Sequence, residues 1–223
     1  MGSTEQLHVN TDDNLRFHPI IHGAARVISI IFHPLFIPVY ISWFLLYNTN
    51  LFAGFRASDK VLLLIRFLVM YSLFPLVTIL LAKGLGFVQS IYLRNPKDRI
   101  IPYIACGLYY FWMWYVLRNQ PEFPKHLVML SLAIFLASSV GLILNSFVKI
   151  SMHGLSVGVM IAFIYLLAFN SDASFGIYLS VALLITGLVC TSRLINSDHN
   201  PFEVYLGLIS GIISQVLAYW FVF

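Results

Sequence analysis

The sequence predicts an all-α protein, a polytopic transmembrane helical bundle of six to seven helices. The first observation is composition, because 60% of the 223 residues are hydrophobic and only 10% are charged. Soluble domains carry about 25% charged residues, so this chain cannot cover a water-exposed globule. The second is a mean hydropathy of +0.87. The third is that the apolar stretches are continuous rather than alternating, which favours spanning helices over a membrane barrel.

Seven apolar segments follow one another, and several approach the ~20 residues that a helix needs to cross a bilayer. They cover 24–47, 61–85, 101–118, 126–147, 152–170, 175–192 and 202–223. We therefore expect a polar N-terminal tail, 1–23, and a single membrane-embedded domain, 24–223. The chain is predicted to be a multi-pass integral membrane protein.

The net charge, the cysteines and the glycine spacing give three further predictions, about binding partners, disulfides and helix packing. In a membrane protein the net charge of +4 indicates contact with lipid headgroups or a polar cavity, not binding of nucleic acid. The two cysteines, Cys106 and Cys190, lie inside apolar segments, so a disulfide framework is not expected. Small residues four apart, Gly154 and Gly158 and again Gly207 and Gly211, predict close helix packing.

Seven crossings would bring the polar junctions far apart in sequence to one membrane surface. That face would hold the N-terminal tail and the junctions 86–100, 147–151 and 192–201, and the other face would hold 48–60, 119–125 and 170–174. The first face collects the side chains that carry chemistry: Arg94, Lys97, Arg99, Lys149, His153, Arg193, His199 and Glu203. We expect a composite site there. The membrane side stays open, because those cations fit both the positive-inside rule and phosphate binding.

The most informative string is SRLINSDHNPFE, residues 192–203. His199 and Glu203 are four apart, so they share one face of a helix. A carboxylate that binds one imidazole nitrogen leaves the other as a nucleophile or base, and Arg193 offers a planar fork of donors to phosphate oxygens. The alternative is a helix start, with Asn200 as N-cap and Glu203 completing a capping box; the two interpretations are compatible.

A second string, KISMHG at 149–154, opens an apolar helix. Ser151 is placed to cap that helix, and the free N–H groups of a helix start favour an anion. Lys149 adds positive charge and His153 lies near the first turn. Taken alone, the string fits a lysine at a headgroup boundary beside a capping serine.

A third string, LRNPKDRIIP at 93–102, is a basic loop that leads into a helix. Arg99 is the preferred phosphate-binding donor, because Pro102 starts the next helix close by. Arg94 and Lys97 are further candidate cations. The alternative is a loop that binds headgroups or sets orientation.

Together the three strings resemble the type-2 phosphatidic acid phosphatase superfamily, membrane phosphohydrolases with a helical-bundle fold. The signature of that family is K-x6-R-P, then P-S-G-H, then S-R-x5-H-x3-D. The third part is matched by Ser192, Arg193 and His199, with Glu203 in place of Asp. The second is matched by Ser151 and His153 without its proline and glycine, and the first only by Arg99, with the proline three positions after it, at Pro102, instead of directly after it.

The resemblance implies hydrolysis of a lipid phosphomonoester or diphosphate through a phosphohistidine, without metal or cofactor. His199 would attack phosphorus, Glu203 would orient its ring, and His153 would protonate the leaving oxygen. Phosphate oxygens would be held by Arg99, Ser151, Arg193 and Lys149, with Arg94 and Lys97 as further donors. The expected substrates are polyprenyl diphosphate, phosphatidic acid, phosphatidylglycerol phosphate or a phosphorylated glycolipid, and the expected location is a bacterial inner membrane.

Two alternatives stay open, as does the oligomeric state. One is a degenerate relative that binds anionic lipid headgroups without turnover, suggested by the altered first and second parts. The other is a small transporter, suggested by ionisable residues inside apolar segments, His33 in FHPLFIP and Arg66 in LLLIRFLV. For His33 we favour a structural role beside the prolines, and for Arg66 snorkelling to the interface.

Overall fold

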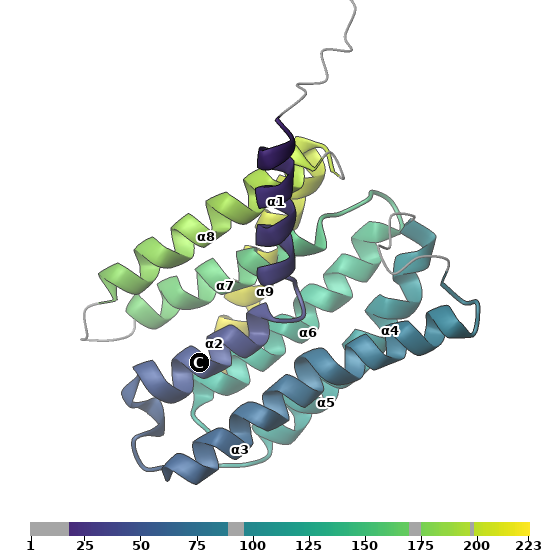
Figure 1. The fold of residues 1–223 in the computed structure, drawn as a ribbon. Coiled ribbons are helices and arrows are strands. Elements are labelled where there is room, and N and C mark those ends of the chain that lie inside the picture. The colour runs from purple at the N-terminus through teal and green to yellow at the C-terminus, as the bar shows by residue number, and fades with distance from the viewer. Residues whose placement is uncertain (1–17, 89–95, 170–174, 197–198) are drawn as a thin grey trace, which may run out of the picture.

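The computed structural model describes residues 18–88, 96–169, 175–196 and 199–223, and within these ranges it is helical with no strand (Figure 1). Six of the described helical stretches are long and apolar enough to cross a membrane. They are α3–α4 at Ala57–Gly84, a helical turn with α5 at Lys97–Arg118, α6 at Lys125–Asn145, α7 at Met152–Phe169, α8 at Gly176–Ile195 and α9 at Pro201–Val222. The predicted all-α polytopic bundle is confirmed.

The stretch Ala57–Gly84 is one continuous rod made of three parts. Helix α3 covers Ala57–Leu68, a π-helical turn covers Val69–Leu73, and α4 covers Phe74–Gly84. Pro75 lies in the first turn of α4, where a missing N–H is tolerated. A short 3₁₀ turn, Pro96–Arg99, leads into α5, Ile100–Arg118.

The first apolar segment, 24–47, is not the single helix that its length predicts. It forms α1, Pro19–Ile31, and α2, Ile37–Asn48, joined by an elbow at 32–36. Pro34 has no N–H to continue the α1 ladder, and Pro38 begins α2. Helix α1 also starts at Pro19, inside the segment expected to be a polar tail. In Figure 1 α1 stands at a steep angle to the bundle, beside the end of α8.

Helices α7 and α9 form the closest pair, and glycine makes that approach feasible. A Cβ added to Gly207 would lie 2.5 Å from the carbonyl oxygen of Ser151, and one added to Gly154 would lie 2.6 Å from that of Val204. Gly158 and Gly211 face backbone atoms of the partner helix even more closely. The predicted small-residue packing is confirmed, and we call this contact the α7–α9 seam.

The remaining positions singled out by the sequence lie away from the seam. Cys106 and Cys190 are both free and buried, as expected. Arg66 is exposed on α3.

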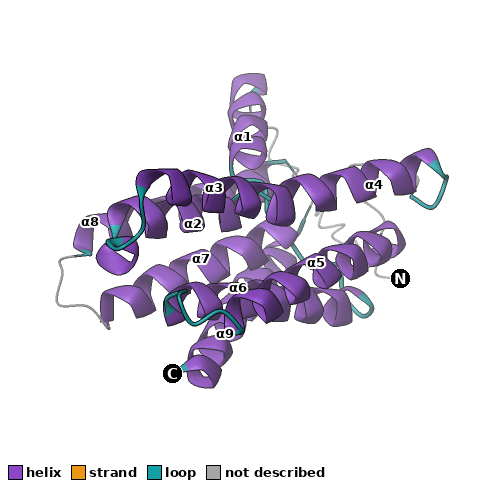
Figure 2. Ribbon diagram, turned by 90° about the horizontal axis from the view of Figure 1, so that it is seen from below, coloured by secondary structure: helices purple, strands orange, loops and turns teal. Residues whose placement is uncertain are grey.

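Seen from below in Figure 2, α3 and α4 form one layer and α5, α6 and α7 another.

Candidate active site

A cavity of about 800 Å³ opens among α1, the elbow, α4, α5, α7 and the α8–α9 junction. One part of its lining is polar and basic and comes from three distant parts of the chain: Arg99, Lys149, His153, Arg193, Asn196 and His199. The other part is apolar and includes Leu35, Ile37, Leu76, Ile79 and Leu80. The lining of the cavity is therefore amphiphilic, because it combines cationic groups with hydrocarbon side chains.

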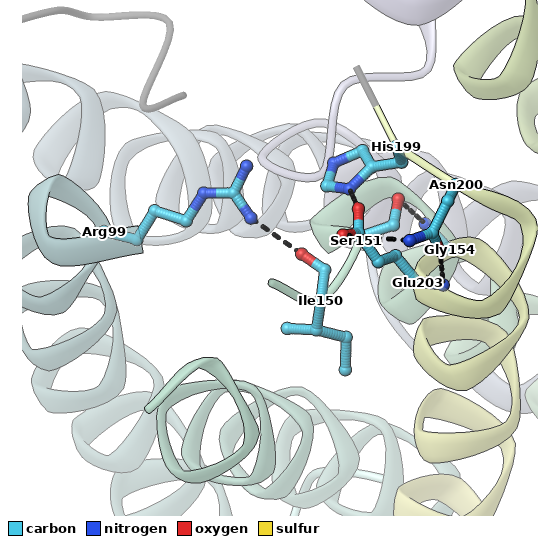
Figure 3. Close-up of polar contacts among 7 residues, drawn as sticks. All are labelled: Arg99, Ile150, Ser151, Gly154, His199, Asn200 and Glu203. Carbon is cyan, nitrogen blue, oxygen red and sulfur yellow. Dashed lines mark hydrogen bonds and ion pairs between the residues drawn. The ribbon is translucent and has the colours of Figure 1, made fainter. Parts of the chain in front are cut away.

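His199 and Glu203 are joined as their spacing predicts. The Nδ1 atom of His199 lies 2.7 Å from Oε2 of Glu203 (Figure 3). A carboxylate can only accept, so Nδ1 carries the proton and Nε2 of the neutral ring has its lone pair available. The His199 side chain is only 3% exposed, so the pair holds the ring in one orientation.

The surroundings keep this ring neutral. Burial is the main cause that lowers the pKa of His199 to about 4, from an ordinary value of 6.5. The hydrogen bond to Glu203 opposes this effect, whereas the positive charges of Arg99, Arg193 and Lys149 reinforce it. A neutral imidazole beside three cations is suited to attack an electrophile that brings negative charge with it.

The start of α9 also contains the predicted cap, which therefore coexists with the hydrogen bond between His199 and Glu203. The N–H of Glu203 donates to Oδ1 of Asn200 at 2.8 Å, and the Asn200 amide donates to Oε1 of Glu203 at 3.4 Å (Figure 3). Pro201 occupies the first turn. Because Asn200 bonds both the backbone N–H and Oε1 of Glu203, the cap also helps to fix the carboxylate that orients His199.

Ser151 joins the start of α7 to the start of α9. Its hydroxyl accepts from the N–H of Gly154 at 3.2 Å, the predicted cap, and its own N–H donates to the carbonyl of Glu203 at 3.1 Å. The residue is fully buried and does not line the cavity. It therefore sets the position of the two helix starts, which are already in contact at the α7–α9 seam.

Arg99 enters the site from the end of the 3₁₀ turn that leads into α5. Its side chain is 5% exposed, and one guanidinium nitrogen donates to the carbonyl of Ile150 at 2.7 Å (Figure 3). That bond places a cation next to the segment 149–153. The remaining N–H groups of a guanidinium are arranged as a fork that suits phosphate oxygens.

His153 faces the same cavity from the first turn of α7. Its Nε2 lies 3.0 Å from the carbonyl oxygen of Ser29 on α1, and because a carbonyl only accepts, that nitrogen carries a proton. The Ser29 hydroxyl lies 3.0 Å from the Ser192 hydroxyl and accepts from Arg193 at 3.4 Å. Ser29 thus connects His153 with Arg193.

The structure brings most, but not all, of the predicted site residues together. Lining the cavity are His199, His153, Arg193, Arg99 and Lys149, and Glu203 joins them through His199. Ser151 lies behind the cavity wall. Lys97 is exposed and is not part of the cavity lining, so its predicted role in phosphate binding has no support from its position. Arg94 lies outside the described residues.

Sequence reasoning missed the contribution of the N-terminal helices. His22, Arg26 and Ser29 of α1 and His33 of the elbow all line the cavity. A usable signal existed for His33, an ionisable side chain deep in an apolar segment. For Ser29 there was none, because a serine in an apolar helix normally bonds to its own backbone.

Comparisons with known proteins add no relative. No family model, no curated protein and no solved structure matches this chain.

Proposed function

We propose that this protein is an integral membrane lipid phosphatase that hydrolyses a phosphomonoester or diphosphate of an amphiphilic lipid. The observation that carries the proposal is the His199–Glu203 pair, 2.7 Å apart, in a cavity that is lined by both cationic and apolar side chains. Such a cavity accepts a phosphate group and a hydrocarbon chain at the same time. We place the protein in a bacterial inner membrane, on the strength of the motif resemblance alone.

The first chemical step follows from the protonation state of the pair. Nε2 of His199 attacks phosphorus, and the bond between phosphorus and the lipid oxygen breaks. The imidazole becomes positively charged, and the carboxylate of Glu203, already bonded to Nδ1, stabilises that charge. His153, protonated on both ring nitrogens for this step, donates the proton of Nδ1 to the leaving lipid oxygen, while its Nε2–H stays bonded to the carbonyl of Ser29. The products are a phosphohistidine and the lipid alcohol, or a lipid monophosphate when the substrate is a diphosphate.

The second step regenerates the enzyme. A water molecule gives its proton to His153 and attacks phosphorus, and the bond from phosphorus to Nε2 breaks to release inorganic phosphate. Arg99, Arg193 and Lys149 are fixed cations around the transferred group in both steps. Their positions require no reorganisation at the moment of reaction, which is the source of most electrostatic catalysis.

Release of inorganic phosphate tests the proposal. The purified protein would be assayed in detergent micelles against phosphatidic acid, phosphatidylglycerol phosphate, polyprenyl diphosphate and a phosphorylated glycolipid, with and without a chelator. We expect release from at least one lipid, undiminished by the chelator, and a loss of about 10⁴-fold or more in His199→Ala. His126→Ala is the matched control, because that ring packs on Phe223, 5.1 Å away, outside the cavity.

Two outcomes would contradict the proposal. Tight binding of these lipids with no release of phosphate would favour the headgroup-binding alternative. Release at an unchanged rate in His199→Ala would remove the proposed nucleophile.

A further inference from the structure

His33 occupies the elbow between α1 and α2, a place for which the motifs assign no role. Its backbone carbonyl accepts from Phe36 at 2.8 Å, and the ring Nδ1 accepts from the N–H of Leu35 at 3.3 Å. The elbow is in turn anchored to the π-helical turn, because the hydroxyl of Ser72 donates to the carbonyl of Leu35 at 2.6 Å. The ring is therefore held by its own loop.

These bonds determine which ring nitrogen carries the proton. A backbone N–H only donates, so Nδ1 is the acceptor and the neutral ring has its proton on Nε2. No hydrogen bond to Nε2 occurs within the described part of the chain. His33 is half-buried and its side chain belongs to the cavity lining, which is the surface that a bound lipid would contact.

The position of His33 identifies the part of a substrate that this donor would meet. Its ring lies edge-on to that of His153, with 5.5 Å between the centroids. His153 is the proposed acid at the leaving oxygen, and Leu35 and Ile37, just beyond His33, belong to the apolar lining. His33 thus lies beside the proposed acid and directly precedes apolar lining residues in the chain.

We propose that His33 is a specificity-determining residue, whose Nε2–H donates a hydrogen bond to an oxygen of the leaving group next to the scissile bond. This inference rests on the proposed phosphatase function. The Nε2–H donor of His33 would favour lipids whose leaving group carries acceptor oxygens, as the ester-bearing glycerol of phosphatidic acid does. A polyprenyl monophosphate has a hydrocarbon leaving alcohol beyond the bridging oxygen and gains nothing from this donor.

Two substitutions distinguish the loss of the Nε2–H donor from a disturbance of the elbow. In His33→Asn, the side-chain oxygen can still accept from the N–H two residues later, as asparagine does in turns, whereas the donor in the cavity is lost. In His33→Gln, the amide nitrogen lies near the place of Nε2 and restores a donor. Each variant would be assayed for kcat/KM on phosphatidic acid, polyprenyl diphosphate and polyprenyl monophosphate.

For His33→Asn we expect kcat/KM on phosphatidic acid to fall by about tenfold, the value of one hydrogen bond. Activity on polyprenyl monophosphate should stay within about twofold, and His33→Gln should recover part of the loss. The assay on polyprenyl diphosphate shows which oxygen accepts the hydrogen bond from His33. A loss confined to polyprenyl diphosphate would mean that the acceptor is an oxygen of the second phosphate and not of a glycerol ester. Equal losses on all three lipids, or no loss on any, would overturn the proposal.

Binding distinguishes failure of this inference from failure of the proposed function. The Kd of each lipid would be measured for the wild-type protein and both variants in the His199→Ala background, where no turnover is expected. A preference for oxygen-bearing leaving groups that His33→Asn removes would support the role of His33 even if no lipid released phosphate. A ratio of the Kd values for phosphatidic acid and polyprenyl monophosphate that His33→Asn leaves unchanged in this background would overturn it.

Discussion

The two walls of the cavity are built by different means. At the α7–α9 seam, backbone touches backbone across four glycines, and the starts of both helices are tied by the bond from Ser151 to Glu203. The opposite wall, α1 and the elbow, is held by side-chain hydrogen bonds: His153 to Ser29, Ser29 with Ser192, and Ser72 to Leu35. The seam wall carries the proposed nucleophile, and the elbow wall meets the proposed leaving group.

This difference explains why the contacts of the seam wall could be predicted from the sequence and those of the elbow wall could not. Backbone contact leaves no room for a Cβ, so it demands glycine at a fixed spacing. A hydrogen bond between distant helices demands only a polar atom on each side, which many residue types supply. We therefore expect substitutions in the seam wall to have large effects and substitutions in the elbow wall to have smaller, graded effects.

The largest effect is expected from the carboxylate on the seam wall. Glu203→Gln keeps the shape of the side chain but removes the charge that stabilises a cationic His199, so we expect kcat to fall by about 10³-fold. Phosphate-release kinetics on the preferred lipid measure the loss. Glu122→Gln, at an exposed position between α5 and α6, is the control. A loss below tenfold in Glu203→Gln would mean that this carboxylate does not support the chemistry.

The next effect concerns the stability of the seam. Gly211→Ala places a methyl group against the carbonyl of Leu155 on α7, and we expect a loss of about 3 kcal/mol in the free energy of unfolding, because the two backbones must separate. Gly187→Ala is the matched control on α8, where nothing lies within 4 Å of an added Cβ. Unfolding in detergent measures both. Equal stability of the two variants would contradict the close approach of α7 and α9.

A smaller effect is expected in the pH dependence of the reaction. Because burial and the neighbouring cations lower the pKa of His199 to about 4, the acid limb of kcat/KM should lie near pH 4 rather than near 6.5. Lys149→Met removes one of those cations, so the pKa of His199 should rise and the limb should move to higher pH. A pH profile of both proteins tests this; an identical limb would show that Lys149 does not act on His199.

The same lowered pKa has a consequence for stability. Between pH 6.5 and about 4 the unfolded chain binds a proton at His199 that the folded protein does not. The contribution of His199 to stability is therefore present above this window and is lost as the pH falls through it.

The smallest effect is expected on the elbow wall. Ser29→Ala removes the hydroxyl bonded to Ser192 and Arg193, so we expect about 1 kcal/mol of lost stability and a several-fold rise in KM as the position of Arg193 loosens. Ser42→Ala is the control, because that buried hydroxyl donates only to Pro38 of its own helix. Ser29→Thr should rescue KM. A loss as large as that of Gly211→Ala would mean that the two walls are equally rigid.

The features that the sequence could predict also differ between the seam wall and the elbow wall. The helical bundle follows from continuous apolar segments, and the approach of His199 to Glu203 follows from a spacing of four. The convergence of Arg99, Lys149, His153 and Arg193 in one cavity depends on how helices stack. It was expected from a count of seven crossings, whereas six of the described helical stretches are long and apolar enough to cross. The break of the first segment is explained by Pro34, but its direction, and with it the arrival of Ser29 beside His153, depends on contacts with α8 that no local pattern encodes.

The most direct test of the account is to trap the phosphorylated protein. The purified enzyme would be mixed with a lipid carrying ³²P at its terminal phosphate, quenched in alkali within one turnover, and digested for mapping of the labelled peptide. We predict an acid-labile, alkali-stable label on the peptide that contains His199, and none in His199→Asn. Brisk phosphate release with no labelled protein, or a label on any other residue, would contradict the proposed nucleophile.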